Sequence, residues 1–373
     1  MRQVFSGAQI FDGTQLLSDH ALIVENGVVV GMKRDLRGDV ELAGGVLAPA
    51  FVDLQVNGGG GIMLDGQADA GRIAAICATH ILLGCAGVMP TLISDSKEAT
   101  SRVIAACVEA AQANVPGFLG LHLEGPHLDP RRKGAHDAAF IRPMENADLA
   151  ALLKAAQKLP ALMVTVAPCS VSLEQVRALA QAGVIVSLGH TECTYEEALA
   201  YIEAGASCAT HLFNAMAPIA ARTPGLAGAV LDTSLPAGLI ADGVHVSSAV
   251  LRLAMAARPE GLFLVSDSMG FAGTELAEMV LNGRLIKRVA GRLTLEDGTI
   301  AGADLRLDRA LATMVRQIGV APSKALAMAT STPAMLIGMG NTLGHLLPER
   351  RADMVYLDPN WQLTKTWWGG VAL

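Results

Sequence analysis

Five ionisable side chains stand at or near the ends of short apolar runs, and their types suit metal-dependent chemistry. They are Glu124, His190, His211, His245 and Asp267. A single strand histidine is usually a hydrogen-bonded core residue, but five ionisable groups at matching positions point to a shared site. A carboxylate and two imidazoles suit a divalent ion of borderline softness and leave open positions for water. We therefore expect Glu124, His190 and His211 to hold one metal ion; zinc suits this set, and iron, manganese or cobalt would fit it too.

The apolar runs before these residues predict the elements that position them. Parallel strands that are buried on both faces read as short, nearly continuous apolar runs bounded by turn residues. Eight such runs cover 47–57, 85–92, 117–124, 161–167, 184–190, 207–214, 237–245 and 262–267. Stretches with helical spacing of apolar residues lie over 70–83, 96–113, 146–158, 173–182 and 195–204, and Ser172 and Thr194 are placed as N-caps of the last two.

Eight strand-then-helix units predict an α/β fold, a (β/α)8 TIM-like barrel. A doubly wound open sheet is the alternative. The carboxyl ends of all barrel strands meet at one face, which is where such barrels carry their chemistry. The five ionisable residues would then face one another. His122 shares a strand face with Glu124 and would either touch the site or fill the barrel.

The two chain ends predict a second, smaller domain. Short valine-rich strands over 21–24 and 28–32 flank Asn26-Gly27, which is a hairpin signal. The stretches 353–357 and 362–366 are also strand-like. Neither end alone has enough strand to bury a core. We expect them to meet in a small β-sandwich, 1–47 plus 341–373, beside a barrel over 48–340, with a further hairpin over 291–301.

Composition excludes several classes of protein. The chain has 373 residues, 51% of them apolar and 17% charged, with a net charge of −7, so disorder is excluded. It has no basic run for nucleic acid, and its six cysteines lack a CxxC pair. No uninterrupted apolar stretch reaches the ~20 residues that a bilayer requires, and 1–12 does not read as a signal peptide. We expect a cytoplasmic protein with neither nucleic acid nor membrane as partner.

Several motifs resemble those of the N-acetylglucosamine-6-phosphate deacetylases, a family of the amidohydrolase superfamily, and the resemblance covers nearly the whole chain. The motifs are His122-Leu123-Glu124-Gly125-Pro126, Lys133-Gly134-Ala135-His136, Gly189-His190-Thr191, Thr210-His211-Leu212-Phe213-Asn214-Ala215-Met216, Pro224-Gly225-Leu226-Ala227-Gly228, Ala241-Asp242-Gly243-Val244-His245 and Ser266-Asp267. The resemblance implies a barrel with a sandwich built from both termini, which agrees with the prediction above.

The resemblance also implies residue roles. Glu124, His190 and His211 match metal ligands, and Asp267 matches the catalytic acid/base. Arg222 matches the residue that reaches the sugar phosphate in the neighbouring subunit of a homodimer. The remaining implied substrate contacts are Ala135, His136, Asn214, Ala215, His245, Ile300, Ala301 and Gly302.

One departure concerns the first barrel strand. Most amidohydrolases end it with His-x-His, which holds a second metal, whereas this chain has Gln55-Val56-Asn57. An amide is a poor zinc ligand. We expect one tightly held divalent ion per subunit, with Gln55 and Asn57 as supporting residues.

The implied activity is deacetylation of N-acetyl-D-glucosamine 6-phosphate to D-glucosamine 6-phosphate and acetate, in amino-sugar catabolism. A metal-bound hydroxide would attack, with Asp267 as acid/base. Three alternatives stay open: the galactosamine epimer as substrate, another amidohydrolase acting on a cyclic amide or nucleobase, and a non-catalytic sugar-phosphate-binding protein.

Overall fold

Parallel strands form the predicted barrel in the computed structural model, which describes residues 1–281 and 283–373. Eight strands follow one another in chain order around the sheet. They are β8 (Phe51–Val56), β11 (Cys85–Ile93), β12 (Leu121–Glu124), β13 (Leu162–Val166), β14 (Ile185–Leu188), β15 (Cys208–Ala209), β16 (Ala237–Leu239) and β17 (Leu262–Leu264). The (β/α)8 prediction is confirmed. The alternative, an open sheet, is excluded because the first strand is bonded to the residues that follow the last strand.

The seam of the barrel lies between β8 and the residues that follow β17. The backbone N–H of Asp267 donates to the Gln55 carbonyl at 3.0 Å, and that of Asn57 donates to the Ser268 carbonyl at 2.8 Å. Val56 and Ser268 form a parallel bridge at the same place. The first and last strands are therefore joined at the carboxyl end, beside the predicted site.

Helices cover the outside of the barrel. Along the chain they are α1 (Ala70–Leu82), α2 (Lys97–Gln112), α3 (Asn146–Ala156), α4 (Leu173–Gln181), α5 (Tyr195–Glu203), α6 (Gly225–Asp232), α7 (Ser248–Ala257), α8 (Leu307–Thr313), a π-helical turn (Met314–Ile318), α9 (Pro322–Ala329) and α10 (Ser331–Leu336). Ser172 and Thr194 are N-caps, each in a capping box, as predicted. None of the helices in the described ranges is long and apolar enough to cross a membrane.

Two strands occupy the first predicted apolar run. The stretch 47–57 was expected to be one barrel strand, but β7 (Val46–Pro49) ends at Pro49 and β8 begins at Phe51. β7 pairs with β2 (Gln9–Phe11) and β21 (Met354–Leu357) of the smaller unit, whereas β8 pairs with β11. Both strands are fully buried, so the hydrophobic pattern has no break where the chain passes from one sheet to the other.

The last predicted strands are shorter than expected. Those over 207–214, 237–245 and 262–267 end at 209, 239 and 264. The residues that directly follow, 210–212, 240–241 and 265–267, stay buried but lie outside the strands, with positive φ at His211 (27°) and Asp267 (48°). The apolar pattern of the sequence indicates burial. Because burial continues past the last strand hydrogen bond, the pattern predicted strands that are too long.

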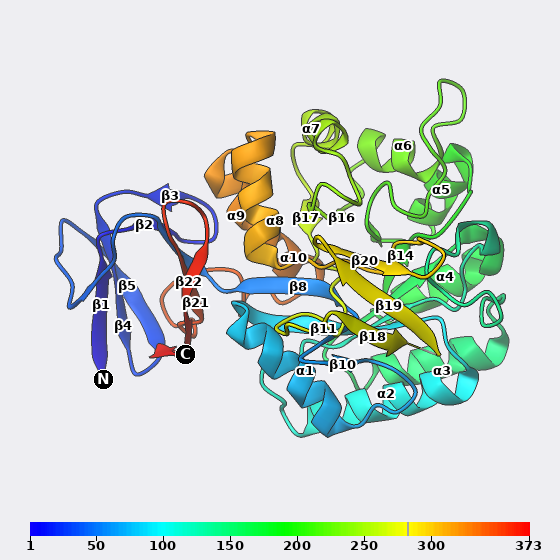
Figure 1. Cartoon of the computed structure of the whole chain (residues 1–373), viewed down its shortest axis with the longest axis horizontal. Helices are drawn as coiled ribbons and strands as arrows, with labels where there is room; N and C mark the ends of the chain where they lie inside the picture. Colours follow the sequence, from blue (N-terminus) through cyan, green and yellow to red (C-terminus); the bar gives the residue numbers. More distant parts are fainter. Residues whose placement is uncertain (282) are drawn as a thin grey trace.

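Both chain ends build the β-sandwich, at the left of Figure 1, where blue and red segments lie together. One sheet has the order β5 (Val28–Arg34), β4 (His20–Glu25), β1 (Arg2–Ser6) and β6 (Val40–Glu41). The other has the order β23 (Val371–Ala372), β22 (Leu363–Trp368), β21, β7, β2 and β3 (Leu16–Leu17). Phe5, Leu22, Leu47, Met354 and Trp367 belong to one buried cluster between them. The predicted hairpin at Asn26-Gly27 joins β4 and β5, with φ values of 51° and 80°.

A three-stranded antiparallel sheet after β17 was not predicted in this form. It contains β18 (Glu278–Leu281), β19 (Arg284–Val289) and β20 (Arg292–Leu295). The expected hairpin over 291–301 is reduced to a bridge between Thr294 and Ile300, because β20 pairs mainly with β19. The buried residues Leu281, Ile286 and Leu293 of this sheet cluster with Met63 and Met269, at the carboxyl end of the barrel.

Replacing Trp367 by alanine tests the union of the two chain ends. Trp367 is 2% exposed and meets Phe5 edge to face, with ring centroids 5.3 Å apart. Trp367→Ala is expected to lower the free energy of unfolding by about 3–5 kcal/mol, measured by urea denaturation. Val371→Ala, in the neighbouring strand but 67% exposed, serves as control and should change it by about 0.5 kcal/mol or less. Equal effects of the two variants would contradict a packed core between the ends.

Candidate functional site

Three buried side chains converge at the carboxyl end of the barrel. Glu124 ends β12, His190 follows β14, and His211 follows β15. Glu124 Oε1 lies 3.1 Å from His190 Nε2 and 2.9 Å from His211 Nε2, and the two Nε2 atoms are 3.1 Å apart. Of the described residues, these three offer ligand atoms close enough to share an ion. The structure thus brings the three predicted ligands together.

Backbone turns aim these side chains into the barrel mouth. His190, His211 and Asp267 have φ values of 46°, 27° and 48°. This region is unfavourable for residues with a Cβ, at about 1–3 kcal/mol each, and recurs at functional sites. Each residue lies just after the end of its strand, and all three line one cavity.

The donor set fits a divalent cation. His190 Nδ1 lies 2.8 Å from the Arg132 carbonyl, which only accepts hydrogen bonds, so Nδ1 carries the ring proton. Metal binding would require Nε2 to be without a proton, and its lone pair would then face Glu124 Oε1 and His211 Nε2. Three lone-pair atoms within 3.1 Å of one another repel unless a positive charge is shared among them.

Glu124 and His211 shift each other's pKa values in opposite directions. In the metal-free protein, burial alone would raise the pKa of Glu124, but the hydrogen bonds that it accepts from His190 and His211 hold that pKa well below its usual range. Burial alone would lower the pKa of His211, but the Glu124 carboxylate raises it. The carboxylate is therefore ionised at neutral pH, as metal binding requires.

Asp267 lies beside this group and receives two amide donors. Its Oδ1 accepts from Asn57 Nδ2 at 2.7 Å and from Gln55 Nε2 at 3.1 Å. The same Gln55 amide lies 3.2 Å from Glu124 Oε1. Burial, followed by the nearby Glu124 charge, raises the pKa of Asp267 to about 6. A carboxyl group with a pKa near neutrality suits both proton acceptance and proton donation.

His136 presents a hydrogen-bond donor to the same space. The backbone N–H of Ser94 donates to His136 Nδ1 at 3.1 Å, so this nitrogen is the acceptor of the neutral ring and Nε2 carries the proton. Burial and the adjacent His190 lower the pKa of His136 to about 3, which keeps the ring neutral. Its Nε2 lies 3.9 Å from Glu124 Oε2. No sequence motif marked Ser94, because its contribution comes from the backbone.

A cavity of about 340 Å³ joins these groups. It is lined by Glu124, His190, His211, Asp267 and Asn57, and by every substrate contact implied by the resemblance except Arg222: Ala135, His136, Asn214, Ala215, His245, Ile300, Ala301 and Gly302. Its apolar side includes Met63, Ile93, Met269 and Leu281, which sequence reasoning missed. These four residues lie in four separate segments, and no spacing in the sequence relates them.

Two other candidates lie outside the cavity. Arg222 is exposed in the loop between β15 and α6, next to a bridge between Ala220 and Thr223. His122 fills the barrel instead of touching the cavity. Its ring lies 3.2 Å from Thr91 Oγ1 and 2.8 Å from Thr165 Oγ1, one layer beneath Glu124.

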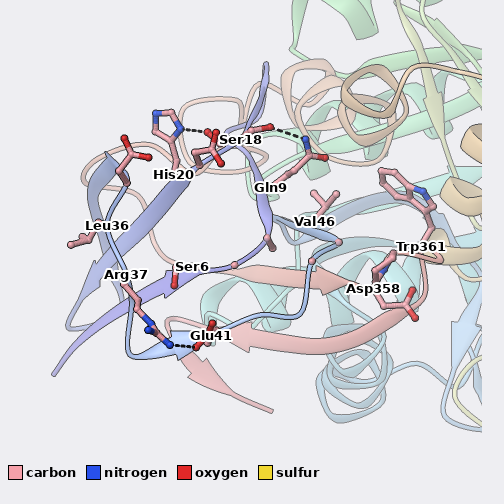
Figure 2. A pocket seen from close by; sticks show the side chains of 17 residues that line it. Ser6, Gln9, Ser18, His20, Leu36, Arg37, Glu41, Val46, Asp358 and Trp361 are labelled. Atoms are coloured by element: carbon pink, nitrogen blue, oxygen red, sulfur yellow. Dashed lines mark hydrogen bonds and ion pairs between the residues drawn. The ribbon is translucent and has the colours of Figure 1, made fainter.

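A larger cavity, of about 1020 Å³, lies in the sandwich (Figure 2). Its ionisable residues include Arg37, which pairs with Glu41, and His20, which bonds to the Ser18 carbonyl. The charged groups that line it are exposed or half-buried, and they do not converge on one point (Figure 2). Size alone therefore does not mark a reactive site, and the smaller cavity is the candidate.

Comparison with known proteins relates nearly the whole chain to one family. A model of the amidohydrolase family matches residues 46–371. An N-acetylgalactosamine-6-phosphate deacetylase of Shewanella sp. (strain ANA-3) is 33% identical, over 99% of this chain and 95% of its own. An N-acetylglucosamine-6-phosphate deacetylase of Haemophilus influenzae is 30% identical, over 98% of each chain.

Solved structures agree with this relation. An N-acetylglucosamine-6-phosphate deacetylase from Pasteurella multocida superimposes with a TM-score of 0.94 at 28% identity, covering all of both chains. A mutant of the Mycobacterium smegmatis deacetylase, in complex with N-acetyl-D-glucosamine 6-phosphate, has a TM-score of 0.92 at 30% identity, covering 100% of this chain and 99% of its own.

Removing one ligand tests the assignment of the metal group. Glu124→Ala deletes the oxygen that both imidazoles face, so the purified variant is expected to lose most of its bound divalent metal. Elemental analysis of the dialysed protein measures this. Glu109→Ala, an exposed carboxylate on α2, is the control and should keep the metal. Full metal content in Glu124→Ala would remove Glu124 from the ligand set.

Proposed function

Since the chain belongs to the amidohydrolase family and is a metal-dependent hydrolytic enzyme, we propose that it deacetylates N-acetyl-D-glucosamine 6-phosphate. The products are D-glucosamine 6-phosphate and acetate, and the place of the reaction is amino-sugar catabolism. One observation carries the proposal: Glu124, His190, His211 and Asp267 line one cavity in a chain similar over its full length to enzymes with this name. A non-catalytic sugar-phosphate-binding protein would need neither Asp267 nor its amide donors.

Glu124, His190 and His211 would hold one divalent ion, and zinc is the ion we propose. Such an ion lowers the pKa of water and polarises the carbonyl group of an amide. The support comes from the fixed Nδ1 proton of His190 and from the convergence of three lone-pair atoms. At strand one, Gln55 and Asn57 donate amide hydrogens to Asp267, and their amide oxygens are poor zinc ligands, so we propose no second tightly held ion.

Asp267 is the proposed acid/base. Its Oδ1 is held by Gln55 and Asn57, which leaves the second carboxylate oxygen to exchange protons. That oxygen takes a proton from the attacking water. It then gives the proton to the amide nitrogen as the C–N bond breaks, because an unprotonated amine anion is too basic to leave. One proton therefore moves from water to the amine, and the carboxylate is restored.

His136 is the proposed donor to the substrate carbonyl. Its neutral ring carries the proton on Nε2, within the cavity, and the ring is held by Ser94 at its other nitrogen. A fixed donor aimed at the oxygen that gains charge stabilises the transition state more than the substrate.

The sugar phosphate is proposed to meet Arg222 of the neighbouring subunit in a homodimer. Arg222 is exposed and lies outside the cavity of its own chain, which supports a role toward a second copy. Asn214, Ala215 and His245 would contact the sugar phosphate on one side, with 300–302 on the other. We further propose a cytoplasmic location. The predicted division into a sandwich (1–47 plus 341–373) and a barrel (48–340) needs its boundary moved to residue 50, because β7 pairs within the sandwich.

The galactosamine epimer is the second candidate substrate. It is favoured by the relatives from Shewanella and Escherichia coli O157:H7, which are 33% and 31% identical and are named N-acetylgalactosamine-6-phosphate deacetylases. The two sugars differ in the orientation of one hydroxyl group, so one enzyme assay with both substrates separates them.

Acetate release from the two epimeric sugar phosphates tests the reaction. We expect the purified protein to release acetate, with the higher kcat/KM for N-acetyl-D-glucosamine 6-phosphate. Asp267→Asn should lower kcat by about 100- to 10,000-fold and keep its metal, because only proton transfer is removed. No acetate from either sugar would refute the proposed activity, and near-normal turnover by Asp267→Asn would refute the proton route.

Replacing Arg222 tests phosphate recognition. Arg222→Ala is expected to raise KM for N-acetyl-D-glucosamine 6-phosphate by about tenfold or more, because a charge-assisted hydrogen bond is lost. The unphosphorylated sugar should show little change. Arg37→Ala, an exposed arginine of the sandwich, is the control. Equal changes for both sugars would place Arg222 outside the phosphate site.

A further inference from the structure

Two loops at the barrel mouth hold each other through the residues around His190. One is 129–132, which contains the 3-10 turn η1 (Pro130–Arg132), and the other is 190–192. The backbone N–H of Asp129 donates to the His190 carbonyl at 3.0 Å, and His190 Nδ1 donates back to the Arg132 carbonyl at 2.8 Å. This exchange fixes the ring of His190 from the side opposite the proposed metal.

Two carboxylates tie the same loops together through side chains. Asp129 Oδ2 accepts from the backbone N–H of Glu192 at 3.2 Å, and the side chains of Glu192 and Arg132 form an ion pair. Asp129 also caps η1, accepting from the backbone N–H of Arg131 at 3.0 Å and from the Arg131 guanidinium. Arg132, whose carbonyl orients His190, is therefore held in two ways. Its side chain pairs with Glu192, and the turn that contains it is capped by Asp129.

Burial distinguishes this arrangement from an ordinary surface ion pair. The Asp129 side chain is 2% exposed, and those of Arg132 and Glu192 are 30% and 28% exposed. Removing the Asp129 carboxylate would leave the backbone N–H of Glu192 without its acceptor.

We propose that Asp129, Arg132 and Glu192 form a clasp that sets the metal affinity of the site by fixing the orientation and tautomer of His190. The inference rests on the proposed metal site, but it does not depend on the identity of the substrate. Asp129 and Glu192 are positioning residues: neither lines the cavity, and both act through the Arg132 carbonyl. Partners of a ligating histidine typically change metal affinity by about 10- to 100-fold when they are removed.

A matched carboxylate elsewhere in the barrel provides the control. Asp148 is 15% exposed, pairs with Arg142 through two hydrogen bonds and accepts the backbone N–H of Glu145 at 2.9 Å. It therefore shares the arginine and backbone partners of Asp129, but it lies in α3 and has no contact with His190. Asp148→Ala should lower the free energy of unfolding without raising the Kd for the metal.

The experiment measures the Kd for Zn²⁺ by competition with a chromophoric chelator. It uses the full chain after its metal has been removed with a chelating agent, and the free energy of unfolding of each metal-free protein is recorded beside the Kd. Asp129→Ala is expected to raise the Kd about 10- to 100-fold, and Glu192→Gln to raise it by less. The double variant should lose less than the product of the two single losses, because both substitutions release the same carbonyl.

Three outcomes would overturn the clasp. The first is a Kd within twofold of the parent for both single variants. The second is an equal loss of affinity in Asp148→Ala, which would assign the effect to general destabilisation. The third is full multiplicativity in the double variant. If Asp129→Ala does not fold, Glu192→Gln alone decides, since it keeps the side-chain shape and the backbone bond to Asp129. Acetate release is not needed for any of these measurements, so failure of the proposed activity is a separate result.

Discussion

Close approach of three lone-pair atoms, Glu124 Oε1, His190 Nε2 and His211 Nε2, is the constraint on which the rest of the site depends. They lie within 3.1 Å of one another in a region that excludes most water. Such an arrangement is unfavourable unless a cation or a proton offsets the repulsion. The barrel allows this close approach because three separate strands end near one point. The positive φ values of His190 and His211 turn the backbone there.

Around this point, one polar atom of each functional side chain is already hydrogen-bonded to a neighbouring group, which leaves its other polar atom free. Gln55 and Asn57 occupy one oxygen of Asp267, Ser94 occupies one nitrogen of His136, and the Arg132 carbonyl occupies one nitrogen of His190. The atom left over on each side chain is the one that faces the cavity. Beneath them, His122 is held by threonine hydroxyls from the neighbouring strands, so the layer under the site is also hydrogen-bonded. The pairings fix Nδ1 of His190 as a donor and Nδ1 of His136 as an acceptor.

Much of this could be predicted because buried parallel strands leave a clear hydrophobic pattern and their ends share one face. The barrel, its main helices and the grouping of Glu124, His190 and His211 follow from that rule. The change of sheet at Ala50 could not be seen, because β7 and β8 are equally buried. Only one hairpin was predicted where the structure has the three-stranded sheet β18–β20. Apolar residues on its exposed face, such as Val280 and Val289, obscure the alternation of apolar and polar residues that marks such strands. Ser94 and Arg132 act through backbone atoms, which carry no residue-type signal.

The seam of the barrel has a consequence for when this protein becomes competent during its synthesis. Asp267 follows the last strand, yet its backbone and side chain are joined to Gln55, 212 residues earlier. Glu124, His190 and His211 all precede Asp267 in the chain, so the three proposed ligands are synthesised before the proposed acid/base. The strand before the seam, β7, in turn pairs with β21 near the C-terminus. The barrel can therefore close at its seam only after Asp267 has been made, and the sandwich can be completed only after β21 has been made.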